Sequence, residues 1–423
     1  MAVCYFDADY SKKYDCSYEL ENSAINVSVR YNIINEIEPI NGVRMIGANT
    51  EYRVRDILIV DYESKRSLML KNAYYAGHSS ILGTPDGKDQ TSFRANVFFQ
   101  HSNYDKLSSL SVTPKVSKIR IFSKVLIDWI GHPSVLITKE EEKQTIELLK
   151  TQGVTTINLN QNNIKSISLS DDWTTRSSSK QIIVDLGGFI ELELCRRVNY
   201  EEVSEYITEL ISYMQLYCPD RMKIDKIEVM VDQNYFGFQF PLVEIAHKDK
   251  YVPSVVDTTL LDFLKVCYSK IPYRKSKEQI RNIPYIVLRT SRSLEDKFLL
   301  FYRFVECYYK KTRPGTTKTF ITCCIKEHHP DKNKLNEEQI EDLAHEIISL
   351  RNHYVHSGYY IKNSALKIRF DKIDGRKNPK DYTANNIDVD WIYERTKTLH
   401  KIVISIIYTC MLGYPEYNYR RHF

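Results

Sequence analysis

The hydrophobic pattern of the chain changes its period near residues 247–254, and this change constrains the fold more than any other feature. Before it, apolar and polar residues alternate in short stretches such as Ala24–Tyr31 and Tyr52–Val60, as in strands with one buried face. After it, apolar residues recur every three or four positions, as on the buried face of a helix. The sequence therefore predicts an α+β protein with an antiparallel β-rich domain over 1–248 and an all-α helical domain over 249–423.

Turn-forming residues divide the N-terminal half into short segments. Phe93–Phe99 and Lys118–Ile127 continue the alternation, and the spacing is typical of an antiparallel sandwich or barrel-like sheet. Residues 1–20, rich in Tyr, Asp and Lys, are interpreted as an irregular lead-in or edge segment. Residues 139–151, rich in Glu and Lys, are expected to form a short helix or a polar turn.

The end of this half combines strands with one helix. Gln181–Asp185 and Phe189–Leu194 suggest a hairpin around Gly187-Gly188, and Lys226–Val231 is expected to form a further strand. Between them, Tyr200–Tyr217 has the pattern of an amphipathic helix.

Helix-start signals divide the C-terminal half. Asp257 is expected to cap a helix through about Tyr268, a capping box of Ser276 and Gln279 predicts another helix, and Ser293 opens one that runs to about Lys310. The basic stretch 310–314 is expected to be a loop. The last helix begins at Asp388 or Asp390, ends at Gly413, and is expected to bury these apolar residues: Leu399, Ile402, Val403, Ile406, Ile407 and Cys410.

The helix from about Asn336 to about Ser357 carries the chemically most informative residues. Asn336 with Gln339 forms a capping box, and a buried stripe follows at helical spacing. Gly358 is a natural stop. The stripe consists of Ile340, Leu343, Ala344, Ile347, Ile348 and Leu350. The end of this helix holds Arg351, Asn352 and His356.

These three residue types suit RNA cleavage without a metal. Histidine titrates near neutrality, so His356 can take a proton from a ribose 2′-hydroxyl or give one to the leaving 5′-oxygen. The guanidinium of Arg351 can hold the phosphate and stabilise charge on its oxygens. The amide of Asn352 can orient either partner.

Helical geometry limits how one chain can use the three. At about 100° per residue, Asn352 and His356 share a face, whereas Arg351 and His356 diverge by roughly 140°. Either the helix loosens before Gly358, or a second copy of the chain completes the site.

An arginine five residues before a histidine also occurs at Arg395 and His400, and a longer spacing links Arg94 to His101. Both alternatives lack an asparagine after the arginine. Because Arg395 and His400 lie inside a long helix, they are expected to form a solvated face.

Residues 250–423 resemble the Apea-like HEPN domain. Its pattern is a helix with a glutamate near its apolar end, a helix ending in RNxxxHxG, and a long apolar last helix ending in glycine. The matching segments here are Phe298–Glu306, Arg351–Gly358 and Trp391–Gly413. The N-terminal part resembles the domain that precedes HEPN in ApeA-type phage-defence proteins, through Trp129 after an alternating strand and the helix Glu201–Tyr217 followed by Cys218-Pro219-Asp220.

The resemblance implies a metal-independent endoribonuclease of phage defence that acts by abortive infection, with Arg351, Asn352, His356 and Glu306 as the catalytic set. Glu306 would orient Arg351 or His356; the alternative is that it pairs with a nearby arginine or backbone group. The expected partners are an RNA substrate, with tRNA as one candidate, and a phage-derived trigger bound by the N-terminal domain. HEPN sites are usually composite, so a homodimer or higher even oligomer is expected. No cofactor or metal is expected.

Charge and cysteine usage agree with this interpretation. Residues 1–250 carry 29 Lys and Arg against 34 Asp and Glu, a net of −5, whereas residues 251–423 carry 30 against 20, a net of +10. The basic half contains the motif, as expected for a half that meets a polyanion. Nine scattered cysteines without a CxxC indicate reduced thiols, and the absence of a signal peptide or long apolar run predicts a cytoplasmic protein with no membrane partner.

Two rival functions remain at this stage. One is a non-catalytic HEPN module that dimerises or binds RNA. The other is the toxin of a toxin–antitoxin pair. The presence of Arg351, Asn352 and His356 together favours the enzyme.

Overall fold

The computed structural model describes most of both halves of the chain. The described residues are 2–7, 9–21, 24–30, 55–79, 90–111, 113–129, 135–140, 143–148, 154–177, 182–218, 224–240, 256–271, 293–312, 315–357 and 389–415. The chain divides into two compact units, Met1–Thr208 with Ile224–Val243, and Glu209–Lys223 with Glu244–Phe423. The sequence-predicted boundary at 248/249 lies outside the described residues.

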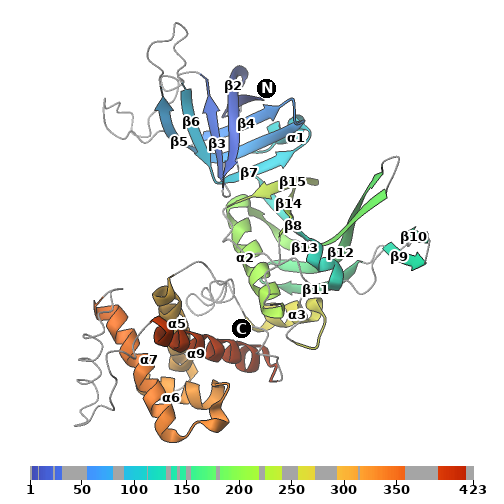
Figure 1. The fold of residues 1–423 in the computed structure, drawn as a ribbon. Helices are drawn as coiled ribbons and strands as arrows, with labels where there is room; N and C mark the ends of the chain where they lie inside the picture. The colour runs from blue at the N-terminus through green and yellow to red at the C-terminus, as the bar shows by residue number, and fades with distance from the viewer. Residues whose placement is uncertain are drawn as a thin grey trace. The chain divides into compact units, whose positions relative to one another are not determined.

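The first unit begins with a closed antiparallel barrel of six strands, seen at the N-terminal end of the ribbon (Figure 1). The first half of β5 pairs with β4 and its second half pairs with β6, which closes the ring β5-β4-β1-β2-β3-β6. The strands are β1 Ala2–Phe6, β2 Asp9–Glu21, β3 Ala24–Val29, β4 Arg55–Asp61, β5 Arg66–Ser79 and β6 Gln90–Ala95. The first part of the predicted antiparallel β-rich region therefore forms a barrel.

The alternating residues of these strands fill the barrel. Side chains on one face of each strand point inward because successive residues alternate between faces. The core is made of Ala2, Cys4, Phe6, Cys16, Ile25, Val27, Val29, Ile57, Ile59, Leu68, Leu70, Ala73, Phe93, Ala95 and Phe98. Helix α1 (Tyr104–Ser108) packs against β5 and β7.

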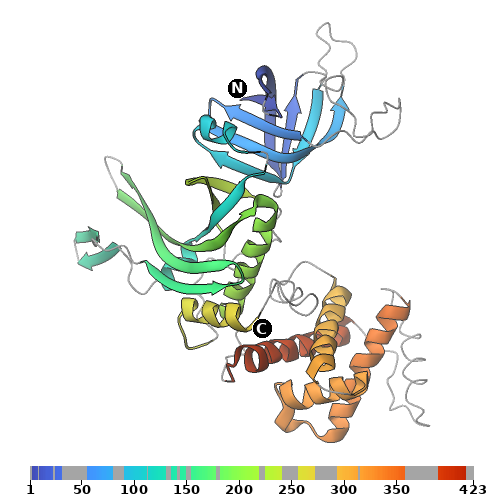
Figure 2. The ribbon, with the colours of Figure 1, turned by 180° about the vertical axis from the view of Figure 1, so that it is seen from behind.

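The same sheet continues beyond the barrel through β7 (Val97–His101), which pairs with the first half of β5. The order from there is β7-β15-β14-β8-β13-β12-β11. The added strands are β8 Lys115–Ser123, β11 Thr155–Gln161, β12 Ile164–Ser177, β13 Ile182–Asn199, β14 Lys226–Val231 and β15 Asn234–Gln239. The first half of α2 (Tyr200–Tyr217) lies beside this sheet (Figure 2). The ring centroids of Tyr200 and Phe99 are 5.9 Å apart.

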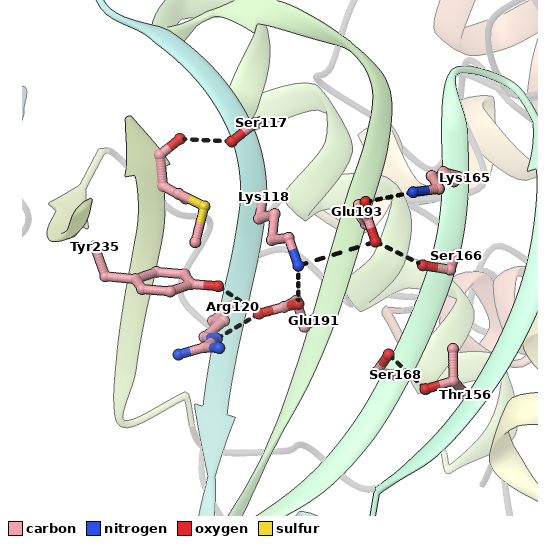
Figure 3. Close-up of polar contacts among 11 residues, drawn as sticks. Ser117, Lys118, Arg120, Thr156, Lys165, Ser166, Ser168, Glu191, Glu193 and Tyr235 are labelled. Carbon is pink, nitrogen blue, oxygen red and sulfur yellow. Dashed lines mark hydrogen bonds and ion pairs between the residues drawn. The ribbon is translucent and has the colours of Figure 1, made fainter. Parts of the chain in front are cut away.

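A network of charged and polar side chains on β8, β13 and β15 is centred on Glu191 (Figure 3). Lys118 Nζ donates to Oε1 of Glu191 at 3.0 Å, while Arg120 Nε and the Tyr235 hydroxyl donate to Oε2 at 2.5 and 2.6 Å. The Arg120 guanidinium also lies 3.7 Å from the centroid of the Tyr235 ring. Burial acts to raise the pKa of Glu191, but these three donors outweigh burial and hold its pKa below the ordinary value.

The described residues of the second unit are mainly helical. The second half of α2 packs on α3 (Leu260–Lys270), with the Tyr213 hydroxyl donating to the Ile271 carbonyl at 3.0 Å. Four longer helices form a bundle in which α5 contacts α6, α7 and α9 (Figure 1). The bounds in the bundle are α5 Leu294–Thr312, α6 Thr317–His328, η4 Lys332–Lys334, α7 Glu337–Ser357, α9 Val389–Ser405 and the π-helical η5 Ile406–Leu412. None of the helices in these ranges is long and apolar enough to cross a membrane.

Several sequence predictions for the second unit are confirmed. Gly413 ends the last helix in the left-handed region at φ 79°, where an added side chain would be strained. Ser293 caps α5 by accepting from the Asp296 amide at 3.1 Å. The prediction that Asp257 caps α3 was wrong, because the cap is Thr259, two residues later, whose side chain accepts from the Asp262 amide. The helix predicted around Ser276 lies outside the described residues.

Other predictions were wrong, and the strands were most often misjudged. Of the stretch 1–20, the residues from Ala2 to Phe6 and from Asp9 onward belong to β1 and β2 of the barrel. The stretch 139–151 contains most of the hairpin β9 (Val135–Glu140) and β10 (Lys143–Leu148). β13 runs straight through Gly187 and Gly188, because both keep their ladder partners in β12.

Three smaller differences concern where elements end, and a fourth is a helix that was not predicted. β8 ends at Ser123 and gives way to the 3₁₀ helix η2 (Lys124–Trp129). The strand expected over Phe93–Phe99 is split at Asn96, because β6 closes the barrel and β7 joins the extended sheet. Lys310 and Lys311 belong to the last turn of α5 and not to a loop, and α6 was not predicted at all.

We expect Glu191→Gln to lower the free energy of unfolding at pH 7 by about 2–3 kcal/mol, because it weakens three hydrogen bonds to a buried carboxylate. The pKa of Glu191 is lowered in the folded state. Its stabilisation is thus complete above the unfolded pKa of about 4.3 and disappears as the pH falls through the folded pKa. The measurement is denaturant unfolding of both proteins from pH 7 down to pH 3.

Glu193→Gln is the matched control on the same strand. Its carboxylate is more exposed and pairs with Lys165 at 2.8 Å, so the loss is expected to be about 1 kcal/mol or less. Equal losses in the two variants would contradict the central role of Glu191.

Candidate active site

Helix α7 is fixed at its start by the capping box that the sequence predicts. The Gln339 amide donates to Oδ1 of Asn336 at 2.8 Å, and the Asn336 amide donates to Oε1 of Gln339 at 3.0 Å. Of the predicted stripe, Ile340, Ala344, Ile347 and Leu350 are buried, while Leu343 and Ile348 are partly exposed. The capping box and the buried apolar face of α7 together fix the orientation of the helix, and with it the direction in which Arg351 and Asn352 point.

α7 remains helical through Ser357. Of the two alternatives considered for the motif, loosening of the helix up to Ser357 is therefore not observed. The backbone of His356 lies in the last turn of this helix, while its side chain is outside the described structure, as is Gly358.

The structure brings Arg351 and Asn352 into direct contact. Both side chains are partly exposed, and Nη1 of Arg351 donates to Oδ1 of Asn352 at 3.0 Å. The guanidinium carbon of Arg351 also lies 5.7 Å from the centroid of the Tyr302 ring. The guanidinium thus has one contact on its own helix and one on α5.

The contact between α5 and α7 rests on an aromatic group. The Tyr302 ring stacks on Phe298 at 6.3 Å, and Phe298 meets Tyr354 of α7 edge to face at 5.6 Å. All three are buried. These three rings form the contact between α5 and α7 next to the position of Arg351 on α7.

Glu306 lies one turn after Tyr302 on α5 and is partly buried, as expected. Among the described residues it makes no ion pair with Arg351, whose contacts are Asn352 and Tyr302. The charges of Glu306 and Arg351 nevertheless both affect the pKa of Tyr302, which lies between the two helices. Burial raises the pKa of Tyr302, the negative charge of Glu306 raises it further, and the positive charge of Arg351 opposes this.

Sequence reasoning missed Tyr302 as a member of this site. Its position one helical turn before Glu306 was visible, but an aromatic residue on an apolar face is most often part of a core. Only the packing of α5 on α7 places its ring against a guanidinium.

Three residues of the alternative arginine–histidine pairs make structural contacts, namely Arg395, His400 and His101. Arg395 forms an ion pair with the buried Glu346 of α7, and His400 stacks on Phe301 of α5 at 4.8 Å with an interplanar angle of 7°. The expectation of a solvated face for this pair was wrong, because α9 packs with that face against α5 and α7. In the first unit, His101 packs against Phe236 at 5.4 Å and accepts from the Asn103 amide.

A second polar cluster joins α6 to the last helix. Nδ1 of His328 lies 3.2 Å from Oγ of Ser405, and its Nε2 lies 3.7 Å from Sγ of Cys410. Cys410 was expected to be buried and is exposed, because the π-helical turns of η5 rotate it off the apolar face. The other five predicted core residues of this helix are buried.

Comparison of the sequence with protein-family models, with curated proteins and with solved structures gives no match. The interpretation of the site therefore rests on its residues and their geometry.

We expect Arg395→Ala to lower the free energy of unfolding of the helical unit by about 2–4 kcal/mol. The substitution removes the guanidinium that compensates the Glu346 carboxylate, whose side chain is only 9% exposed. Arg351→Ala is expected to change it by about 1 kcal/mol or less, since it removes one neighbouring hydrogen bond and one partly exposed cation–π contact. Thermal unfolding of the two variants measures the difference, and similar losses would contradict these assignments.

Proposed function

We propose that this protein is a metal-independent endoribonuclease of the HEPN type that acts in phage defence by abortive infection. Its catalytic set is Arg351, Asn352 and His356 on α7, with Glu306 on α5. The observation that supports this best is the placement of the Arg351 guanidinium, which is held by Asn352 and by Tyr302 of the helix that carries Glu306. A fixed guanidinium at the partly exposed end of a basic helical unit is suited to an RNA phosphate.

In the proposed reaction, Arg351 binds the scissile phosphate and stabilises the charge that develops on its oxygens. The ribose 2′-hydroxyl attacks the phosphorus in line while a histidine takes its proton. The bond to the 5′-oxygen breaks, and a second histidine gives that oxygen a proton. The products are a 2′,3′-cyclic phosphate and a 5′-hydroxyl. The nucleophile belongs to the substrate, so no metal-bound water is required.

The continuous helix supports a shared site. Because α7 is helical through Ser357, Arg351 and His356 leave it about 140° apart. Two motif helices placed side by side about a two-fold axis bring two arginines and two histidines to one seam. The proposed assembly is therefore a homodimer or a higher even oligomer.

The roles of the remaining parts follow from this proposal. The substrate is RNA, with tRNA as one candidate. The β unit, with its barrel and extended sheet, is the sensor domain that binds a phage-derived trigger and controls the helical unit. The rival reading, a HEPN module that binds RNA without cleaving it, is an outcome of the first test below.

We expect Arg351→Ala and His356→Ala to reduce RNA cleavage by at least about 100-fold, because each removes a group that acts in the transition state. The assay uses purified protein with EDTA present and identifies the ends of the cut RNA. Cyclic phosphate and 5′-hydroxyl ends are expected, whereas strict dependence on Mg²⁺ or Mn²⁺ would contradict the mechanism.

The matched controls for this assay are Arg395→Ala and His400→Ala, compared per folded protein below their melting temperatures. Both should keep most of the activity, since these residues contact Glu346 and Phe301 inside the bundle. If Arg395→Ala and His400→Ala lost as much activity as Arg351→Ala and His356→Ala, the choice of site would be contradicted. Binding of RNA without cleavage by the wild type would favour the non-catalytic module.

We further expect cleavage to require two protomers. Excess His356→Ala protein mixed with wild type should change the activity per wild-type chain, because mixed dimers hold one histidine instead of two. Formation of mixed dimers is followed in parallel with differently tagged chains. If mixed dimers form and dilution gives monomers, yet activity per wild-type chain is constant, each protomer holds its own site.

A further inference from the structure

Tyr302 combines deep burial with an unsatisfied hydroxyl. The residue is 2% exposed, and its hydroxyl has no hydrogen-bond partner among the described residues. A buried polar group without a partner typically destabilises the fold by about 1–3 kcal/mol. A phenylalanine would fill the same space and keep the stacking on Phe298 without this penalty.

Two other buried tyrosines of the helical unit, Tyr309 and Tyr213, have a hydrogen-bond acceptor for the hydroxyl. Tyr309 of the same helix is 1% exposed and donates to Oε2 of Glu327 at 3.0 Å. Tyr213 donates to the Ile271 carbonyl at 3.0 Å. Their hydroxyls serve the fold, whereas the hydroxyl of Tyr302 does not.

The surroundings of Tyr302 supply one acceptor and one donor that its hydroxyl could use. A hydroxyl offers one donor and two acceptor lone pairs. Glu306 is four residues further along α5, so the two side chains share a face of the helix. The Arg351 guanidinium lies against the Tyr302 ring. Burial and the charge of Glu306 keep the pKa of the phenol above its usual value, so it retains its proton at neutral pH.

We propose that Tyr302 is the positioning residue through which Glu306 orients Arg351. In the RNA-bound state its hydroxyl accepts a hydrogen bond from the Arg351 guanidinium and donates one to the Glu306 carboxylate. In this arrangement the hydroxyl links Glu306 to Arg351, which form no direct ion pair with each other in the structure. It rests on the proposed function, because it assigns the guanidinium to a substrate phosphate.

The test compares wild type, Tyr302→Phe, Glu306→Gln and the double variant in steady-state RNA cleavage. Tyr302→Phe should lower kcat about tenfold, the effect of one lost hydrogen bond of average strength, with KM changed less than threefold. Its midpoint of thermal unfolding should be unchanged or higher, because the unpartnered hydroxyl is gone. Glu306→Gln should act on kcat in the same way, and the double variant should be no slower than the slower single variant, because both changes break one chain of contacts.

Tyr309→Phe is the matched control. It removes a satisfied hydroxyl, so the midpoint of unfolding should fall by about 2–4 °C while kcat stays within twofold of wild type.

Three results would overturn the inference. A wild-type kcat in Tyr302→Phe, while Arg351→Ala is inactive, refutes the role of Tyr302 and leaves the proposed function intact. Multiplying effects of Tyr302→Phe and Glu306→Gln would show that the two residues act separately. Full cleavage by Arg351→Ala would refute the proposed function and this inference with it.

Discussion

The packing of α5 against α7 is the interaction on which the candidate site depends. Phe298, Tyr302 and Tyr354 meet between the two helices and exclude water from the contact. This aromatic group fixes the level at which Arg351 leaves α7 relative to Glu306 on α5. The same contact places the Tyr302 ring against the guanidinium of Arg351, and no carboxylate among the described residues forms an ion pair with this guanidinium. A guanidinium that is not neutralised by an ion pair is available to a phosphate.

The guanidinium of Arg395 differs from that of Arg351, because it forms an ion pair with Glu346. It joins α9 to α7 in the interior of the bundle, where each charge compensates the other. His400 adds a stacked contact to α5. Two arginines that each precede a histidine by five residues, Arg351 and Arg395, thus have different contacts in one helical unit. Spacing alone does not distinguish them, but the absence of an asparagine after Arg395 does.

The β unit follows from a different constraint, the closure of the barrel. β5 is long enough to pair with β4 and β7 along its first half and with β6 along its second. This strand therefore belongs to both the barrel and the extended sheet, which makes the two parts one continuous hydrogen-bonded structure. On the extended sheet, Glu191 accepts hydrogen bonds from Lys118 and Arg120 of β8 and from the hydroxyl of Tyr235 on β15. We propose the trigger-binding role for this unit from the family resemblance and not from the network.

The sequence by itself determined the helices with strong local signals and the general β-rich and helical halves. The capping box of α7, the start of α5, the bounds of α2 and the glycine end of the last helix all depend on contacts between residues near in sequence. The tertiary structure decided the rest. The place of β1 in the barrel depends on its pairing with β4, and the path of β13 depends on its pairing with β8 as well as with β12. β4 and β8 lie far from these strands in sequence. For the candidate site, the local pattern is the basis on which Arg351, Asn352, His356 and Glu306 are proposed. The contact of Tyr302 with Arg351 exists only once α5 packs on α7, because no local pattern encodes the meeting of residues about fifty positions apart.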